Sequence, residues 1–196
     1  MVDDKERDAY LERVRIGGAS VHNAQVILAD YDPEWPARYE RVAALIRGAL
    51  GETVLQLEHA GSTSVPGLPA KPIIDIILAV PDSANENEYV PQLERVGFAL
   101  RIREPEWFEH RLLKFVDPDV NLHVFTSGCR EIEKMLLFRD WIRAHPEDRD
   151  LYASEKRRLG TQTWKYVQHY ADAKTAVVDE ILARAGWSPD PVAPTA

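Results

Sequence analysis

The chain has 196 residues, of which 45% are hydrophobic and 29% charged, a composition typical of a soluble globular domain. Its formal net charge of −8 argues against general nucleic-acid binding, and no apolar run approaches the roughly 20 residues of a membrane-spanning helix. The lone cysteine, Cys129, permits no internal disulfide and fits a reducing compartment. The charged N-terminus lacks the apolar segment of a signal peptide, so we expect a cytoplasmic protein without a membrane anchor.

The first half of the chain shows hydrophobic patterns of both helices and strands. A polar helix or arm is predicted over residues 1–20. A second helix is expected to begin near Asp32-Pro33, because apolar side chains follow at helical spacing as far as Ile46. The remaining predictions are strands over 25–28, 54–58, 73–80 and 98–102 and a short helix over 89–96.

The second half predicts a hairpin followed by helices. The hairpin turns at Asp117-Pro118-Asp119, between strands over 110–116 and 120–125. Three helices are expected over 131–144, 147–160 and 170–185, and the Pro-rich residues 187–196 are expected to be disordered. This order of elements predicts an α+β fold, with a mixed sheet core that is capped by C-terminal helices.

The most informative stretch covers residues 58–80, EHAGSTSVPGLPAKPIIDIILAV. Its first strand leads into a loop of small residues, whose backbone N–H and hydroxyl groups can approach a phosphate closely. The next strand is apolar except for Asp75, and a buried carboxylate must be paired or must bind a metal. We therefore expect a phosphate at the loop and Mg²⁺ at Asp75. In an alternative reading, Asp75 pairs with Lys71, which would otherwise contact the phosphate.

Other polar side chains are placed to complete such a site. Asn121 and His123 alternate along the predicted strand 120–125, so they share one face and can line a cleft beside Asp75. A histidine with a purely structural role is the alternative. Cations on the C-terminal helices are expected to bind anionic groups of a ligand, the alternative being ordinary surface charges. These cations are Arg139, Lys156 and Lys174.

The sequence resembles the GrpB family. The resemblance rests on HAGSTSVPGLPAKPIIDIILAV, and also on YDPEWPARYE, NLHVF and LLFRDWIRAHPEDRDLYASEKRRL. It extends over residues 24–186, between the N-terminal arm and the C-terminal tail. It implies membership of the nucleotidyltransferase superfamily, with a DNA-polymerase-β-like mixed sheet and C-terminal helices.

That superfamily carries Gly-Ser, then two acids spaced as Asp-x-Asp on the next strand, then a third acid on a later strand. Gly61-Ser62 match, and Asp75 matches the second acid. The first acid would fall at Ile73, and the strand over 120–125, where the third is expected, has no carboxylate. Two-metal catalysis needs ligands for both ions, so the standard mechanism lacks part of its donor set.

Two functions follow from the resemblance. In the first, the domain binds a nucleotide or another phosphorylated ligand with Mg²⁺ and transfers a nucleotidyl group. In the second, it is a non-catalytic folding-accessory or protein-interaction domain, like the GrpB-like domain fused to dephospho-CoA kinase in some actinobacteria. For the first function the expected residues are Asp75 and His123 in catalysis, Asp75 as the metal ligand, and Gly61, Ser62, Thr63, Lys71, Asn121, Arg139, Lys156 and Lys174 in ligand binding.

Overall fold

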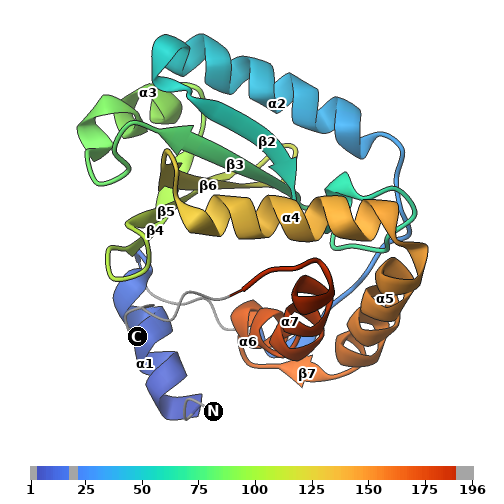
Figure 1. The fold of residues 1–196 in the computed structure, drawn as a ribbon. Helices are drawn as coiled ribbons and strands as arrows, with labels where there is room; N and C mark the ends of the chain where they lie inside the picture. Colours follow the sequence, from blue (N-terminus) through green and yellow to red (C-terminus); the bar gives the residue numbers. More distant parts are fainter. Residues whose placement is uncertain (1–3, 18–21, 189–196) are drawn as a thin grey trace.

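The computed structural model describes residues 4–17 and 22–188 and contains a five-stranded mixed sheet (Figure 1). Strands β3 and β6 at its centre are parallel, whereas the other neighbouring pairs are antiparallel. The parallel pairing places Asp75 directly beside Asn121. In spatial order the strands are β2 (Gln56–Ala60), β3 (Ile74–Val80), β6 (Val120–Thr126), β5 (His110–Phe115) and β4 (Ala99–Glu104).

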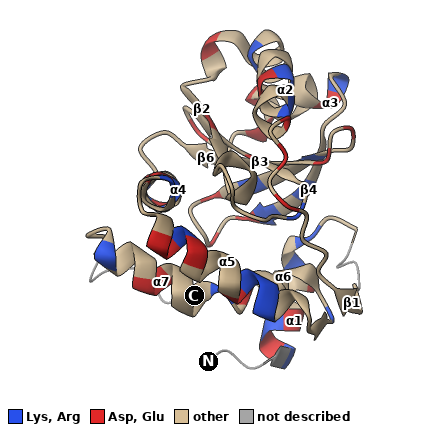
Figure 2. Cartoon of the chain, turned by 90° about the vertical axis from the view of Figure 1, so that its right-hand side faces the viewer, with Lys and Arg blue, Asp and Glu red and all other residues tan. Residues whose placement is uncertain are grey.

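Helices cover both faces of this sheet (Figures 1 and 2). On one face, α2 (Trp35–Leu50) and α3 (Val90–Arg95) bury alternate residues of β3, such as Ile76 and Leu78, which are fully inaccessible to solvent. On the other face, α4 (Arg130–Ala144) packs against Phe125. Because both faces are covered, β3 is apolar along nearly its whole length, and Asp75 is its exception.

Of the remaining helices, α5 (Pro146–Gly160), α6 (Val167–Asp172) and α7 (Thr175–Arg184) form a layer below α4 (Figure 2). The loop after β2 packs into this layer through Leu68, which contacts a cluster from α5 and α7. At the far edge of the sheet, α1 lies against β4. The other elements are α1 (Asp4–Val14), a small sheet of β1 (Ala24–Gln25) with β7 (Thr163–Trp164), and 3₁₀ turns η1 (Gly51–Thr53), η2 (Ser62–Ser64) and η3 (Glu86–Glu88).

The predicted α+β class with a mixed sheet is confirmed, and the structure corrects several element boundaries. The single helix expected over 170–185 is wrong, because the chain breaks between α6 and α7 and turns Lys174 over the Tyr170 ring. The strand expected over 25–28 is only two residues long, since its partner β7 is equally short. The helix expected over 1–20 ends at Val14, and residues 18–20 and most of the predicted tail lie outside the described residues. None of the helices that the structure describes combines the length and apolar character needed to cross a membrane.

Candidate functional site

Polar side chains of β3 and β6 meet on the face of the sheet that also contacts α4. Asn121 Nδ2 donates a hydrogen bond of 2.7 Å to Asp75 Oδ1, and His123 Nε2 lies 3.7 Å from the same oxygen. The Asp75 and His123 side chains keep 28% and 21% of their surface exposed. The structure thus brings three of the expected site residues together, and a ligand can reach them.

The loop after β2 places small residues against this carboxylate. Gly61 has φ of 63°, and a Cβ added there would overlap the Asp75 side chain, so the position requires glycine. Ser62 interacts with the hydroxyl of the buried Tyr152. Thr63 is turned away, because its hydroxyl donates to the Ile73 carbonyl at 3.2 Å and is buried. Of the expected phosphate-binding residues, Gly61 and Ser62 therefore lie at the site, whereas the Thr63 side chain serves the loop itself.

Replacing Gly61 by alanine is expected to destabilise the fold by about 1–3 kcal/mol, from the positive φ and the overlap with Asp75. Gly51→Ala is a matched control, since Gly51 has φ of 53° but nothing within 4 Å of an added Cβ. Urea denaturation of both variants separates the two causes. Equal losses of stability would show that Asp75 yields to the added methyl group without cost.

Three lysines approach Asp75 from different parts of the chain. Lys71 precedes β3, Lys156 lies on α5, and Lys174 occupies the break between α6 and α7. Each ammonium group interacts electrostatically with Asp75. Tyrosine rings support them, since Lys174 Nζ lies 4.7 Å and Lys71 Nζ 5.8 Å from the Tyr170 ring centre. The cluster therefore gathers three lysine amino groups around one carboxylate, and that of Lys156 also donates a hydrogen bond to the Pro69 carbonyl.

Burial and neighbouring charges shift the pKa values of the three lysines and of Asp75. Burial, with the nearby Lys174, lowers the pKa of Lys71 to about 8 and that of Lys156 well below its usual value. Burial also lowers the pKa of Lys174. For Asp75, burial acts to raise the pKa, but His123 in its protonated form, together with Asn121 and Lys71, outweighs it and holds the pKa below its usual range. The site thus favours negative charge and disfavours further positive charge.

A second row of polar groups, which sequence reasoning missed, runs across the same face from α1 to His123. Tyr10 donates to Glu104 at 2.6 Å, and Glu104 Oε2 lies 2.7 Å from His110 Nδ1. His110 Nε2 lies 3.1 Å from His123 Nδ1. Alternation along the strand is the sequence signal that could have found His110. It puts His110 on the same face as Lys114, which pairs with Asn121.

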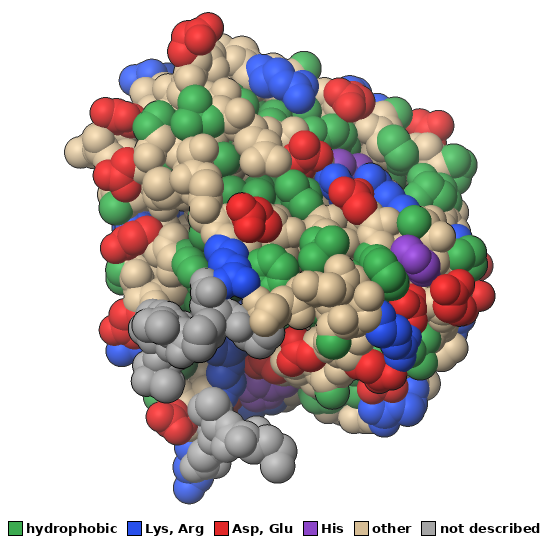
Figure 3. Space-filling model, in the orientation of Figure 1, with side chains coloured by type: hydrophobic (Ala, Val, Ile, Leu, Met, Phe, Trp, Pro, Cys, Tyr) green, Lys and Arg blue, Asp and Glu red, His purple; other side chains and the backbone are tan. Residues whose placement is uncertain are grey.

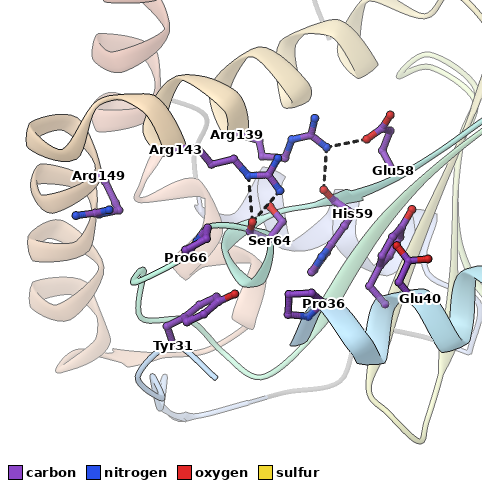
Figure 4. A pocket seen from close by; sticks show the side chains of 11 residues that line it. Tyr31, Pro36, Glu40, Glu58, His59, Ser64, Pro66, Arg139, Arg143 and Arg149 are labelled. Carbon is purple, nitrogen blue, oxygen red and sulfur yellow. Dashed lines mark hydrogen bonds and ion pairs between the residues drawn. The ribbon is translucent and has the colours of Figure 1, made fainter. Parts of the chain in front are cut away.

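Arg139 lies elsewhere, which corrects its expected place at the phosphate. It lines a pocket of about 600 Å³ at the edge of β2, together with Glu58 and Ser64 (Figure 4). Its guanidinium is occupied by Asp140, Glu58 and the His59 carbonyl. Arg143 in the same pocket donates twice to the Ser64 carbonyl and so anchors the loop. These arginines are satisfied by their neighbours, whereas Lys71, Lys156 and Lys174 interact with Asp75.

The donor set around Asp75 does not fit a resident Mg²⁺. The part of the chain that the structure describes has no group of three or more His, Cys, Asp or Glu side chains placed to hold a metal ion. One carboxylate oxygen already accepts a hydrogen bond from Asn121, and the surrounding ammonium groups repel a cation. Mg²⁺ demands near-octahedral oxygen ligation, so a single carboxylate among lysines is a poor centre for it.

Comparison with known proteins decides the family. The family model described as GrpB protein matches residues 25–184. The chain belongs to the GrpB family. It is 58% identical to a UPF0157 protein of Halalkalibacterium halodurans, over 91% of each chain, and 44% identical to one of Streptomyces coelicolor, over 87% of this chain and 89% of that one. The GrpB family predicted from the motifs is thereby confirmed.

One further relative has a solved structure, and another is a longer protein that contains a region similar to this chain. The crystal structure of conserved protein GrpB from Enterococcus faecalis superposes with a TM-score of 0.69 at 28% identity, covering 81% of this chain and 96% of that one. A dephospho-CoA kinase of Mycolicibacterium paratuberculosis is 29% identical over 86% of this chain, which corresponds to 50% of the kinase chain. A region similar to this chain thus makes up half of that longer protein.

Proposed function

We propose that this GrpB domain binds a phosphorylated small molecule on the sheet face around Asp75. The observation that carries the proposal is the clustering of Lys71, Lys156 and Lys174 at the rings of Tyr152 and Tyr170, where all three interact electrostatically with Asp75. Burying like charges together is costly unless a counter-charge compensates them. With the lysines ionised, Asp75 neutralises one of three positive charges. An anionic group on a ligand would neutralise the others.

The lysines around Asp75 are a local concentration of basic groups in a chain whose net charge is −8. Figure 3 shows basic and acidic side chains interspersed over the described part of the face seen in Figure 1, a pattern unlike the continuous basic surface typical of nucleic-acid binding. A compact cluster of lysines with hydroxyl groups nearby suits a small anion, since Lys binds phosphate as a point charge.

A nucleotide is the phosphorylated ligand that the superfamily resemblance suggests, with nucleotidyl transfer as the reaction. Ser62 and the lysines would hold its phosphates, and Asp75 and His123 would face the reacting group. Because the donor set fits Mg²⁺ poorly, the proposal assigns the phosphate to the lysines, and any Mg²⁺ would be delivered by the nucleotide itself.

A thermal-shift series tests the proposal. Pyrophosphate, ATP and inorganic phosphate would be compared with sodium sulfate at matched ionic strength, each with and without Mg²⁺. We expect pyrophosphate or ATP to stabilise the protein without Mg²⁺, by about 2.7 kcal/mol at a hundredfold excess over Kd. A response no larger than that to sulfate would contradict the proposal.

The pKa of Lys71 predicts how this affinity depends on pH. An anion needs the ammonium form, and in the free protein the pKa of Lys71 is about 8. Above pH 8 binding must draw in a proton, so affinity is expected to fall by about tenfold per pH unit. Titration calorimetry at pH 9 in two buffers of different ionisation enthalpy measures the proton uptake. An affinity that stays constant from pH 7 to pH 10 would rule out this role of Lys71.

The second candidate is an accessory domain that acts on another protein. It is favoured by the dephospho-CoA kinase of Mycolicibacterium paratuberculosis, in which the matching region is half of the chain. In this case purified dephospho-CoA kinase would bind the domain or fold in higher yield beside it, and none of the phosphate compounds would bind.

A further inference from the structure

Tyr10, Glu104, His110 and His123 form a hydrogen-bonded row that ends at Asp75, and the proposed function does not by itself require this row. His110 is 3% exposed, and its ring stacks on those of His123 and Phe125. Burial lowers the pKa of His110 to about 4, although Glu104 acts to raise it, so this ring is neutral at pH 7. Burial also acts to raise the pKa of Glu104, but hydrogen bonds from His110 and Tyr10 outweigh it and keep this group ionised.

The direction of each hydrogen bond follows from these charge states. An ionised carboxylate only accepts, so His110 Nδ1 carries the hydrogen and donates it to Glu104. The neutral His110 ring then has a bare Nε2, which accepts from His123 Nδ1–H. In neutral His123 the remaining nitrogen, Nε2, is therefore the unprotonated one.

This bare nitrogen faces another acceptor. His123 Nε2 lies 3.7 Å from Asp75 Oδ1, which is too long for a hydrogen bond. Glu131 at the start of α4 adds a further acidic group near His123, and it is mostly buried. His123 Nε2 and Asp75 Oδ1 are thus two hydrogen-bond acceptors that face each other, and both side chains are partly exposed. A bound molecule that supplies a donor hydrogen between them would satisfy both.

We infer that Glu104 and His110 are positioning residues, which fix His123 in its Nδ1–H tautomer so that Nε2 accepts a hydrogen bond from a hydroxyl group of the ligand. This rests on the proposed function for the place of the ligand, and it narrows the ligand class to phosphorylated compounds that also carry a hydroxyl. The lysines hold the phosphate, and His123 selects the hydroxyl beside it.

The first test needs no ligand. Nitrogen-15 NMR of labelled histidine at pH 8 distinguishes a protonated from a bare ring nitrogen, and the other histidines serve as internal references. We expect His123 to show a protonated Nδ1 and a bare Nε2. A protonated Nε2, in either the neutral or the doubly protonated ring, would overturn the inference.

Two variants show whether the row sets this tautomer. His110→Phe keeps the ring contacts but removes the acceptor, so the Nδ1–H form of His123 is expected to lose its dominance. Tyr10→Phe is the matched control, because it removes a hydrogen bond at the far end of the row and leaves the Glu104–His110 contact in place. An unchanged His123 signal in His110→Phe would contradict the positioning role.

The second test concerns the hydroxyl. Glycerol 3-phosphate and propyl phosphate differ in their hydroxyl groups, and we expect the first to bind about tenfold more tightly at pH 8. His123→Phe should abolish this preference, and His110→Phe should reduce it. Equal affinities in the wild type would overturn the hydroxyl selection. If neither probe binds, the result counts against the proposed function, while the tautomer measurement still decides the role of Glu104 and His110.

Discussion

Replacing Lys174 by methionine is expected to stabilise the ligand-free protein and, at the same time, to weaken its binding of pyrophosphate. In the free protein, burial lowers the pKa of Lys174, which means that the fold disfavours its charge. Methionine fills similar space beside the Tyr170 and Tyr152 rings and removes that charge. In the complex, the same charge would contact the anion.

The two effects have opposite signs and are measured separately. Urea denaturation without ligand should show a gain of about 1–3 kcal/mol, the range for replacing buried charges with apolar groups. Calorimetric titration with pyrophosphate should show a Kd raised about 10- to 100-fold, which corresponds to one charge-assisted hydrogen bond.

Arg158→Gln provides the control for general loss of positive charge. Arg158 is on α5, its side chain is 60% exposed, and it pairs with Glu155, so both stability and affinity should stay close to wild type. If Lys174→Met lost stability and bound pyrophosphate as wild type does, the lysine cluster would be a structural feature of the fold and not a ligand site.

The sequence predicted those parts of the site that are formed by residues close together in the chain, and not those formed by contacts between distant segments. Gly61, Ser62 and Asp75 are close in the chain, and the alternation of Asn121 and His123 along one strand put both on one face. The structure brings these residues together, as the local pattern predicts, and their role in binding stays a prediction. The parallel pairing that sets Asn121 beside Asp75 is a long-range contact, and nothing in the local pattern encodes it.

The positions of the lysines and Arg139 relative to Asp75 could not be predicted from local sequence pattern. Arg139, Lys156 and Lys174 were candidates because each is a cation on a predicted helix, but the face that a helix turns inward depends on what it packs against. Packing brings Lys156 and Lys174 to Asp75, whereas Arg139 points to Glu58 at the edge of β2. The break before Lys174 was missed too, since no proline or glycine marks it.

Asp75→Asn separates a counter-charge from a metal ligand. As the counter-charge of three lysines, Asp75 stabilises the ligand-free fold, and its neutral replacement should cost about 2–4 kcal/mol, since unpaired buried charges remain. For the same reason the variant should bind pyrophosphate without Mg²⁺ about tenfold more tightly, because the anion meets a more positive site. If Asp75 were instead a ligand of Mg²⁺, the variant should lose the pyrophosphate binding that depends on Mg²⁺.

The pH dependence of stability gives an independent check on this role. The pKa of Asp75 is lowered in the folded state, so its contribution is fully present above the ordinary value of 3.8 and is lost as the pH falls through the lowered value. The difference in unfolding free energy between wild type and Asp75→Asn should therefore be constant near pH 7 and shrink in that acidic range. A difference that persists undiminished in acid would mean that asparagine fails for steric reasons. Weaker pyrophosphate binding by the variant in the absence of Mg²⁺ would contradict the counter-charge role of Asp75, because removing a negative charge beside the anion should strengthen its binding.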